Sequence, residues 1–231
     1  MIDIKELSKT YSVGGEKIKA VENASLVVKK GEMVSIIGHS GSGKTTLLSL
    51  IGGLTKPDLG LVLIDGKDIW SMSDNDLSEF RNRKISFIYQ FASLFPTLTV
   101  YENIILPLTF GNSHIEYAGS NAMQFCEAVG ILDKMECYPS QLSGGQQRRV
   151  AIARAFITNP EIILADEPTG DLDEENESEV MNYFKKLNEE NGTTFIIVTH
   201  NSDLARKTRR QMSMTNGVIT SLEFDACLLN N

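Results

Sequence analysis

The chain has 231 residues, of which 42% are hydrophobic, 7% aromatic and 23% charged, the composition of a folded globular protein and not of a disordered or collagen-like chain. This length allows one large domain, or one domain that carries an inserted subdomain. Acidic residues number 30 against 22 basic ones, and the net charge of −8 argues against a protein whose whole surface binds nucleic-acid backbones.

The cysteines and the apolar runs indicate the cellular compartment. Cys126, Cys137 and Cys227 are odd in number and lack metal-ligand spacing, so we expect free thiols in a reducing compartment. Charged residues interrupt the N-terminal segment, which therefore has no apolar core of the signal-peptide kind. Apolar runs such as 195–198 are far shorter than the roughly 20 residues of a membrane-spanning helix. We expect a cytoplasmic protein that does not insert directly into a membrane.

The first half of the chain predicts two kinds of strand. Residues 2–7 and 20–28 are apolar with partial alternation, which is typical of antiparallel strands packed on one face, and Gly14-Gly15 indicates a turn between them. The elements predicted next are a buried strand over 33–37, a helix over 45–54, and strands over 61–64 and 85–89.

The second half predicts an insertion followed by alternating helices and strands. Between residues 98 and 135, apolar side chains recur at helical spacing and Gly111, Gly119 and Gly130 divide the segment, which indicates an inserted, mostly helical subdomain. The elements predicted after it are a helix over 146–157, a strand over 162–165, a helix over 174–190 and a strand over 194–198. This alternation predicts an α/β fold with a largely parallel sheet, whose carboxyl edge binds ligands.

The strongest local signal for chemistry is a phosphate-binding loop between a predicted strand and a predicted helix. It reads Gly38-His39-Ser40-Gly41-Ser42-Gly43-Lys44-Thr45, followed by Thr46. The glycines let backbone N–H groups converge on phosphate oxygens, and the helix N-terminus adds positive potential. Lys44 is expected to reach the β and γ phosphates, and Thr45 to bind Mg²⁺.

Further candidate residues end the predicted strands at the same edge. Asp166 and Glu167 follow the strand 162–165, so Asp166 is a candidate Mg²⁺ ligand and Glu167 a candidate general base. His200 arrives at this edge after the strand 194–198, where an imidazole can hydrogen-bond a γ phosphate. The side chains of His39 and His114 lack such a setting and are assigned no role of their own.

A second glycine-rich segment precedes the predicted helix 146–157. It reads Leu142-Ser143-Gly144-Gly145-Gln146 and forms another helix N-terminus able to bind an anion. One chain therefore offers two phosphate sites. With these motifs, Gln90 and the segment from Asp171 to Asp173 in this order, the sequence resembles the ATP-binding cassette (ABC) ATPases from about residue 2 to residue 222.

The resemblance implies a role for each matching residue. ATP would be held by the loop residues 38–46, with Tyr11 stacked on adenine, and Thr45, Gln90 and Asp166 would hold Mg²⁺. The implied catalytic residues are Glu167, which activates water, His200, which senses the γ phosphate, Gln90 and Lys44. Ser143, Gly144, Gly145 and Gln146 would bind the ATP of an opposite chain in a head-to-tail homodimer with two ATPs, and Asp171 and Asp173 would link the two sites.

The resemblance also implies an organisation and a partner. One nucleotide-binding domain would divide into an ATP-binding core with an antiparallel part (1–90 and 160–222), a helical subdomain (91–159) and a tail (223–231). Within the family, segments such as Leu94-Phe95-Pro96-Thr97 resemble the lipoprotein-release and macrolide-efflux group. Its members serve a separate integral membrane permease subunit that moves lipoproteins, hydrophobic drugs or peptides. The chain would lie on the cytoplasmic face of the membrane, with its partner docked near residues 91–96. Asp171 departs from the asparagine expected there, which leaves its effect on dimer closure open.

Two other classes of function remain open from the residues. The catalytic residues also fit a soluble cassette ATPase that regulates or assembles other proteins, as in cell division or iron-sulfur assembly. A nucleic-acid machine is disfavoured, because the basic run Arg206, Lys207, Arg209 and Arg210 is short and the net charge is −8. We expect no nucleic-acid partner.

Overall fold

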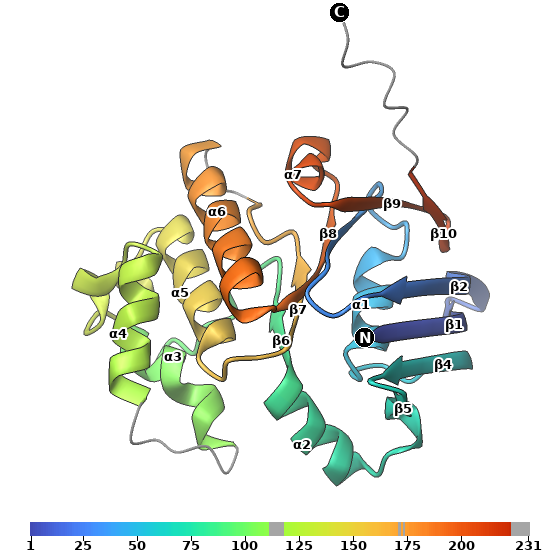
Figure 1. The fold of residues 1–231 in the computed structure, drawn as a ribbon, viewed down its shortest axis with the longest axis horizontal. Helices are drawn as coiled ribbons and strands as arrows, with labels where there is room; N and C mark the ends of the chain where they lie inside the picture. The colour runs from blue at the N-terminus through green and yellow to red at the C-terminus, as the bar shows by residue number, and fades with distance from the viewer. Residues whose placement is uncertain (111–117, 171, 173, 223–231) are drawn as a thin grey trace, which may run out of the picture.

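The structure, a computed structural model, describes residues 1–110, 118–170, 172 and 174–222. These residues form two sheets and the helices around them (Figure 1). His114, the predicted linking residues Asp171 and Asp173, the thiol of Cys227 and the tail 223–231 lie outside the described residues.

The smaller sheet is antiparallel, as the N-terminal pattern predicts. Its strand order is β2-β1-β4-β5. The strands are β1 (Ile2–Val13), β2 (Glu16–Val28), β4 (Leu59–Ile64) and β5 (Lys67–Asp68). The β1–β2 turn uses Gly14 and Gly15, both at positive φ, which glycine adopts without steric cost.

The larger sheet has the order β10-β9-β3-β8-β7-β6. Its strands are β10 (Val218–Ser221), β9 (Arg210–Thr215), β3 (Met33–Ile37), β8 (Thr194–Thr199), β7 (Ile162–Asp166) and β6 (Ile85–Ile88). All neighbours from β9 to β6 pair in parallel, and β10 pairs with β9 antiparallel. The segments that follow β3, β6, β7 and β8 therefore emerge at one edge of the sheet.

Helices cover both faces of the larger sheet, with α1 on one side and α5 and α6 on the other (Figure 1). The helices are α1 (Lys44–Ile51), α2 (Asp74–Lys84), α3 (Val100–Thr109), α4 (Ala118–Ala128), α5 (Gly144–Phe156), α6 (Glu174–Asn191) and α7 (Ser202–Arg206). Short 3₁₀ helices are η1 (Ile69–Ser71), η3 (Leu132–Lys134) and η4 (Pro139–Gln141).

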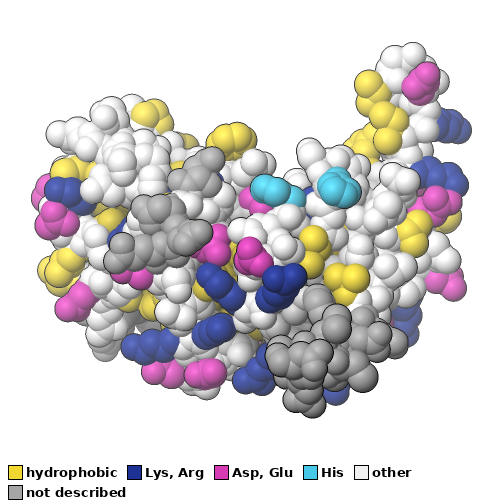
Figure 2. Space-filling view, turned by 90° about the horizontal axis from the view of Figure 1, so that it is seen from above, with side chains coloured by type: hydrophobic (Ala, Val, Ile, Leu, Met, Phe, Trp, Pro, Cys, Tyr) yellow, Lys and Arg dark blue, Asp and Glu magenta, His cyan; other side chains and the backbone are white. Residues whose placement is uncertain are grey.

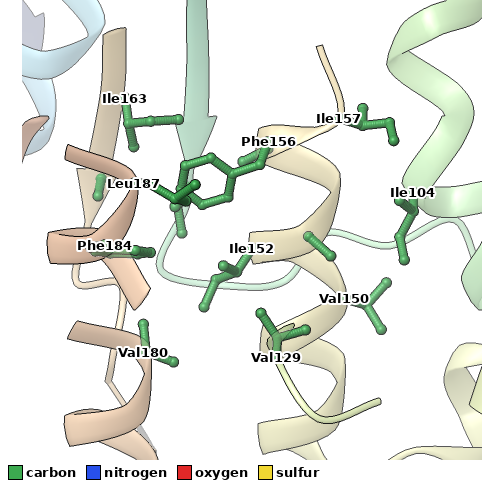
Figure 3. Close-up of a cluster of buried hydrophobic side chains, with 14 of the residues drawn as sticks. Ile104, Val129, Val150, Ile152, Phe156, Ile157, Ile163, Val180, Phe184 and Leu187 are labelled. Carbon is green, nitrogen blue, oxygen red and sulfur yellow. The ribbon is translucent and has the colours of Figure 1, made fainter. Parts of the chain in front are cut away.

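The buried strands separate two hydrophobic cores. On β7, Ile162 and Leu164 face the core under α1 and the antiparallel sheet, whereas Ile163 and Ala165 face the core under α5 and α6, because alternate residues of a strand point to opposite faces. In the second core, Phe156 of α5 lies between α6 and the sheet (Figure 3). Burial of such a side chain stabilises the fold by about 1.5–3 kcal/mol, and the ring of Phe156 contacts Phe184 of α6 and Phe195 of β8, which holds α5 against both elements.

The predicted α/β class, with an antiparallel sheet and inserted helices, is confirmed. Helix α2 was missed, because its sequence is polar and Leu77 is its one buried residue; its start is instead stabilised by Ser73, which caps the N–H of Asp76. Two details were wrong. Helix α5 begins at Gly144, two residues before its predicted start, and Gly119 lies inside α4 instead of interrupting it.

Candidate functional site

A cavity of about 480 Å³ opens at the carboxyl edge of the larger sheet. Figure 2 shows the hollow on this face, with histidine side chains gathered beside it. Its lining residues come from β2, the loop after β3, the start of α1, and the ends of β6, β7 and β8 or the residues directly after them: Ile18, Lys19, Ala20, His39, Ser40, Gly41, Gly43, Lys44, Thr45, Thr46, Gln90, Asp166, Glu167 and His200. The structure therefore brings the predicted phosphate-loop, Gln90, strand-end acid and histidine positions to one cavity.

The loop 38–43 has a backbone that only glycine accommodates at two points. Gly43 has φ 103°, and a Cβ there would lie 2.0 Å from the Ala20 carbonyl oxygen. A Cβ on Gly38 would lie 2.3 Å from the Met214 carbonyl oxygen. Helix α1 starts directly after this loop, and no side chain caps its N-terminus. Its first N–H groups are therefore available to an anion in the cavity.

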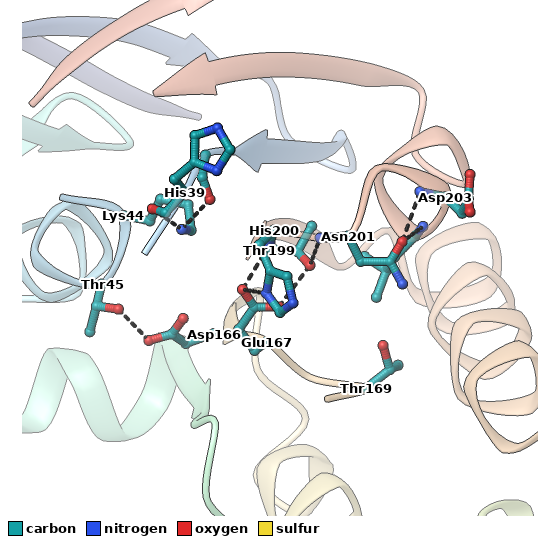
Figure 4. A network of polar contacts seen from close by, with 12 residues as sticks. His39, Lys44, Thr45, Asp166, Glu167, Thr169, Thr199, His200, Asn201 and Asp203 are labelled. Carbon is teal, nitrogen blue, oxygen red and sulfur yellow. Dashed lines mark hydrogen bonds and ion pairs between the residues drawn. The ribbon is translucent and has the colours of Figure 1, made fainter. Parts of the chain in front are cut away.

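Lys44 is held at the base of the cavity. Its side chain is 7% exposed, and Nζ donates hydrogen bonds to the carbonyl oxygens of Gly38 at 2.6 Å and His39 at 3.0 Å. These two carbonyls fix the ammonium group inside the curve of the loop (Figure 4). Within the described chain, the buried Ser42 Oγ has no hydrogen-bond partner, so the loop also contains a polar atom that is not yet satisfied.

Thr45 and Asp166 bring a hydroxyl and a carboxylate oxygen together at the cavity. Thr45 Oγ1 donates to Asp166 Oδ2 at 2.7 Å. Burial raises the pKa of Asp166, and the nearby Glu167 charge raises it further, while the Thr45 hydrogen bond and Lys44 oppose the rise. A bound cation would relieve both the burial and the repulsion. Hydroxyl and carboxylate oxygens next to a phosphate loop fit Mg²⁺, which takes one or two carboxylates and completes its shell with phosphates and water.

The described residues contain no cluster of three or more His, Cys, Asp or Glu side chains that could hold a metal without a substrate. Cys126 and Cys137 carry free thiols, as predicted, and burial raises the pKa of Cys126 to about 11, so that thiol is inert.

Glu167 is the most constrained acid of the cavity. Its Oε2 accepts from Thr199 Oγ1 at 2.8 Å, and its Oε1 accepts from the His200 N–H at 2.8 Å and lies 2.7 Å from His200 Nδ1 (Figure 4). The backbone of Glu167 has φ 46°, a left-handed conformation that costs a residue with a side chain about 1–3 kcal/mol. Neighbouring contacts therefore hold this carboxylate in one orientation.

Arg148 is a site residue that the sequence analysis missed. Its guanidinium donates to the carbonyl oxygens of Tyr89 at 2.8 Å, Gly170 at 3.2 Å and Glu167 at 3.4 Å, and it is 4% exposed. A signal was present in the sequence, because Arg148 lies on the buried face of α5, in line with Ile152. A charge on an apolar helix face indicates a buried partner.

The segment 142–146 lies outside the lining of this cavity. Ser143 is the N-cap of α5: its Oγ accepts from the Gln146 N–H at 3.3 Å, and Gln146 Oε1 accepts from the Ser143 N–H at 2.9 Å. Tyr11 also lies outside the lining; it pairs with Ile18 across the β1–β2 ladder, with Lys9 Nζ 5.7 Å from its ring centre. Residues Ile18 to Ala20 of the facing strand line the cavity instead, which the sequence did not indicate.

Residues 21–170 match the family model described as ABC transporter. The chain belongs to the ABC transporter family. It is 41% identical over 216 residues to the lipoprotein-releasing system ATP-binding protein LolD of Bordetella pertussis, a match that covers 94% of each protein.

Solved structures of ABC cassettes have the same fold. The cassette MJ0796, described as a dimer in a post-hydrolysis state bound to ADP and Pi, superposes with a TM-score of 0.90 at 42% identity, over 97% of this chain and all of that one. CbiO1 of Clostridium perfringens, part of the transporter complex cbiONQ, superposes with a TM-score of 0.82 at 28% identity, over 94% of this chain and 86% of that one.

The family fixes the general chemistry of the cavity. As an ABC ATPase, the chain binds ATP, and its ATP hydrolysis is coupled to transport. Among the helices that the structure describes, none has the length and apolar character required to cross a membrane. The predicted division into core, helical subdomain and tail, and the role of each residue, stay predictions.

Proposed function

We propose that the chain is the ATP-hydrolysing subunit of a lipoprotein-releasing transporter, and that it works as a head-to-tail homodimer around two ATP molecules and Mg²⁺. The observation that carries this proposal is Glu167, held by Thr199 and His200 in a cavity that also contains Lys44 and Asp166. The 41% identity to LolD supports the substrate class, and the dimeric form of MJ0796 supports the assembly.

Each group of the cavity has a distinct part in the proposed reaction. Lys44 and the N–H groups at the start of α1 bind the phosphates and stabilise the charge that develops during phosphoryl transfer. Thr45, Asp166 and Gln90 hold Mg²⁺, which neutralises charge on the β and γ phosphates when bound. Glu167 accepts the proton of the attacking water. His200 and Thr199 orient that carboxylate, and His200 contacts the γ phosphate.

The second anion site is proposed to act on the partner's nucleotide. The N-terminus of α5 lies outside the cavity of its own chain, so its N–H groups and Ser143 can bind the γ phosphate of an ATP held by another copy. Two copies arranged head to tail then enclose two ATPs. Hydrolysis removes the γ phosphate that joins the copies, and the dimer opens.

A membrane subunit is proposed to bind a groove between α2, β6 and the helical region. The groove has a volume of about 400 Å³ and is lined by residues such as Arg81, Phe87, Pro107 and Phe110. Phe110 and Phe91 are strongly exposed, and exposed apolar patches of this kind mark interaction sites. In this position the partner would contact the end of β6, next to Gln90, and would sense the state of the cavity.

Glu167→Gln tests the proposed function. The amide keeps the size of the side chain but cannot accept the proton, so we expect hydrolysis to fall by about 10²- to 10⁴-fold while ATP binding persists. The variant should form a stable dimer with ATP and Mg²⁺, measured by size-exclusion chromatography with light scattering. Glu161→Gln is the matched control, because Glu161 precedes the other end of β7 and pairs with Lys84 at the surface.

Two outcomes would contradict this proposal. If Glu167→Gln hydrolysed ATP at the wild-type rate, this carboxylate would not be the general base. If the variant stayed monomeric at millimolar ATP-Mg²⁺, the proposed dimer would be wrong. Purification of the tagged variant from detergent-solubilised membranes of its host tests the partner: an integral membrane subunit supports the transport function, and soluble partners alone would favour a regulatory or assembly function.

A further inference from the structure

A second polar cluster lies behind the Glu167–His200 pair and has no part in the mechanism proposed above. Its centre is Glu177 of α6, whose side chain is 15% exposed. The carboxylate has three partners from three segments. Glu177 Oε2 accepts from Thr169 Oγ1 at 3.3 Å and from Asn201 Nδ2 at 3.2 Å, and Oε1 lies 3.0 Å from Lys207 Nζ.

Two of these partners belong to the segments that carry the catalytic pair. Thr169 is two residues after Glu167, in a turn closed by the Gly170 N–H, which donates to the Glu167 carbonyl at 3.1 Å. Asn201 directly follows His200. One carboxylate on α6 therefore connects the turn after β7 to the turn after β8. Figure 4 shows Thr169 and Asn201 of these two turns beside Glu167 and His200.

A short chain of hydrogen bonds runs from Asn201 to the catalytic carboxylate. The Asn201 N–H donates to Thr199 Oγ1 at 3.0 Å, and that hydroxyl donates to Glu167 Oε2 at 2.8 Å. Asn201 is fixed from the other side, because its Oδ1 caps α7 by accepting from the N–H groups of Asp203 and Leu204. The remaining amide group is thereby directed at Glu177.

The third partner explains why an acid is tolerated at this depth. A shielded carboxylate is costly unless it is paired and hydrogen-bonded. Lys207, the residue after α7, supplies the charge, and the first turns of α6 add positive potential from the helix N-terminus. With its charge balanced, the carboxylate can accept hydrogen bonds from both turns.

We propose that Glu177 is a positioning residue for ATP hydrolysis: by accepting hydrogen bonds from Thr169 and Asn201, it holds the turns after β7 and β8 together and so keeps Glu167 and His200 in their mutual orientation. This inference rests on the proposed function. Glu177 does not line the cavity, so it acts on the rate of the chemical step and not on nucleotide binding. A displacement of the catalytic groups by about 1 Å is sufficient for a large rate effect.

The test compares kcat and KM for ATP in Glu177→Ala, Glu177→Gln and Lys207→Met. Glu177→Ala removes all three contacts, and we expect kcat to fall about 10- to 100-fold, the effect of a misplaced catalytic group, with KM for ATP unchanged. Glu177→Gln keeps an acceptor for Thr169 and Asn201, and Lys207→Met keeps both hydrogen bonds. Both should retain kcat within about fivefold of wild type, because each loses one partly exposed ion pair.

Glu179→Ala is the matched control. Glu179 lies on the same helix and also forms an ion pair, with Arg149 at 3.3 Å, but it is exposed and forms no bond to the described residues of either turn. We expect it to keep wild-type kcat. Thermal unfolding of every variant identifies the fraction folded at the assay temperature, so that kcat is expressed per folded chain.

Three results would overturn the positioning role. These are an unchanged kcat in Glu177→Ala, a rise in KM without loss of kcat, and equal losses in Glu177→Ala and Glu177→Gln, which would show that the charge acts and not the hydrogen bonds. Failure of the proposed function gives a different result: the rate of ATP hydrolysis would then be the same with and without the Lys44 side chain. The positioning role would then fall with it.

Discussion

The chain has two glycine-rich helix N-termini, at α1 and at α5, and they differ in how their N–H groups are satisfied. Helix α1 has no side-chain cap, and its first turn faces a cavity of about 480 Å³. Helix α5 is closed by a reciprocal pair of hydrogen bonds between Ser143 and Gln146. Two glycine-rich segments therefore give one helix N-terminus whose N–H groups lack a side-chain partner and one whose N–H groups already have one.

The two N-termini therefore differ in what they gain when a phosphate binds. An uncapped N-terminus with a buried lysine gains hydrogen bonds when phosphate arrives. The capped N-terminus must exchange an existing bond for a new one, so its net gain is smaller. We expect α1 to determine the affinity for nucleotide and α5 to determine whether two loaded chains associate.

Among these variants, we expect Lys44→Ala to change the affinity for ATP most strongly. It removes the ammonium group from the α1 side, and hydrogen bonds from a charged group contribute about 1.5–3 kcal/mol, so ATP affinity should fall about 10- to 100-fold. Titration calorimetry with ATP-Mg²⁺ measures the change. Lys30→Ala is a suitable control, because Lys30 pairs with Glu161 at the surface. Retained affinity in Lys44→Ala would contradict the role of α1.

Ser143→Ala tests the α5 side. Loss of the cap should lower the free energy of unfolding by about 1 kcal/mol and leave the ATP affinity of the single chain unchanged, while the ATP-dependent dimer of Glu167→Gln is lost. Ser143→Asp sharpens the test, because a carboxylate keeps the cap but repels a phosphate. If Ser143→Asp still dimerises with ATP, the proposed contact of α5 with the partner's nucleotide is wrong.

In the absence of nucleotide, we expect Asp166 to make a small, pH-dependent contribution to the free energy of unfolding. Its pKa is raised above the ordinary value of 3.8 by burial, so the folded chain binds this proton more tightly than the unfolded chain. The stability contribution of this group therefore decreases as pH rises through the raised pKa. Asp166→Asn removes the charge, and its stability advantage over wild type should appear as pH rises from 3.8 and then level off. Urea unfolding as a function of pH measures this; parallel curves would contradict it.

The sequence was sufficient where one local pattern determines both structure and chemistry. The loop from Gly38 to Thr45 lies between a continuous apolar strand and a helix, and the strand-end positions of Asp166 and His200 follow from the same buried strands. Parallel strands bring these ends to one edge whatever the details of packing, so the loop and strand-end residues of the cavity were predictable.

The sequence was insufficient where a contact depends on packing between distant segments. Arg148 and Glu177 reach carbonyls and side chains of turns that only tertiary structure brings near them. Helix α2 was missed for the opposite reason, because it buries one residue and carries almost no apolar pattern. Ile18, Lys19 and Ala20 of β2 line the cavity because the antiparallel sheet lies against the phosphate loop.

The three carbonyl contacts of Arg148 have a mechanical consequence. A guanidinium is planar and rigid, and here it contacts Tyr89, directly after β6, and the turn after β7 at Glu167 and Gly170. These segments cannot rotate independently while the guanidinium stays in place. Helix α5, which carries Ser143 at its start, is thereby connected through one side chain both to the segment after β6 that carries Gln90 and to the turn after β7.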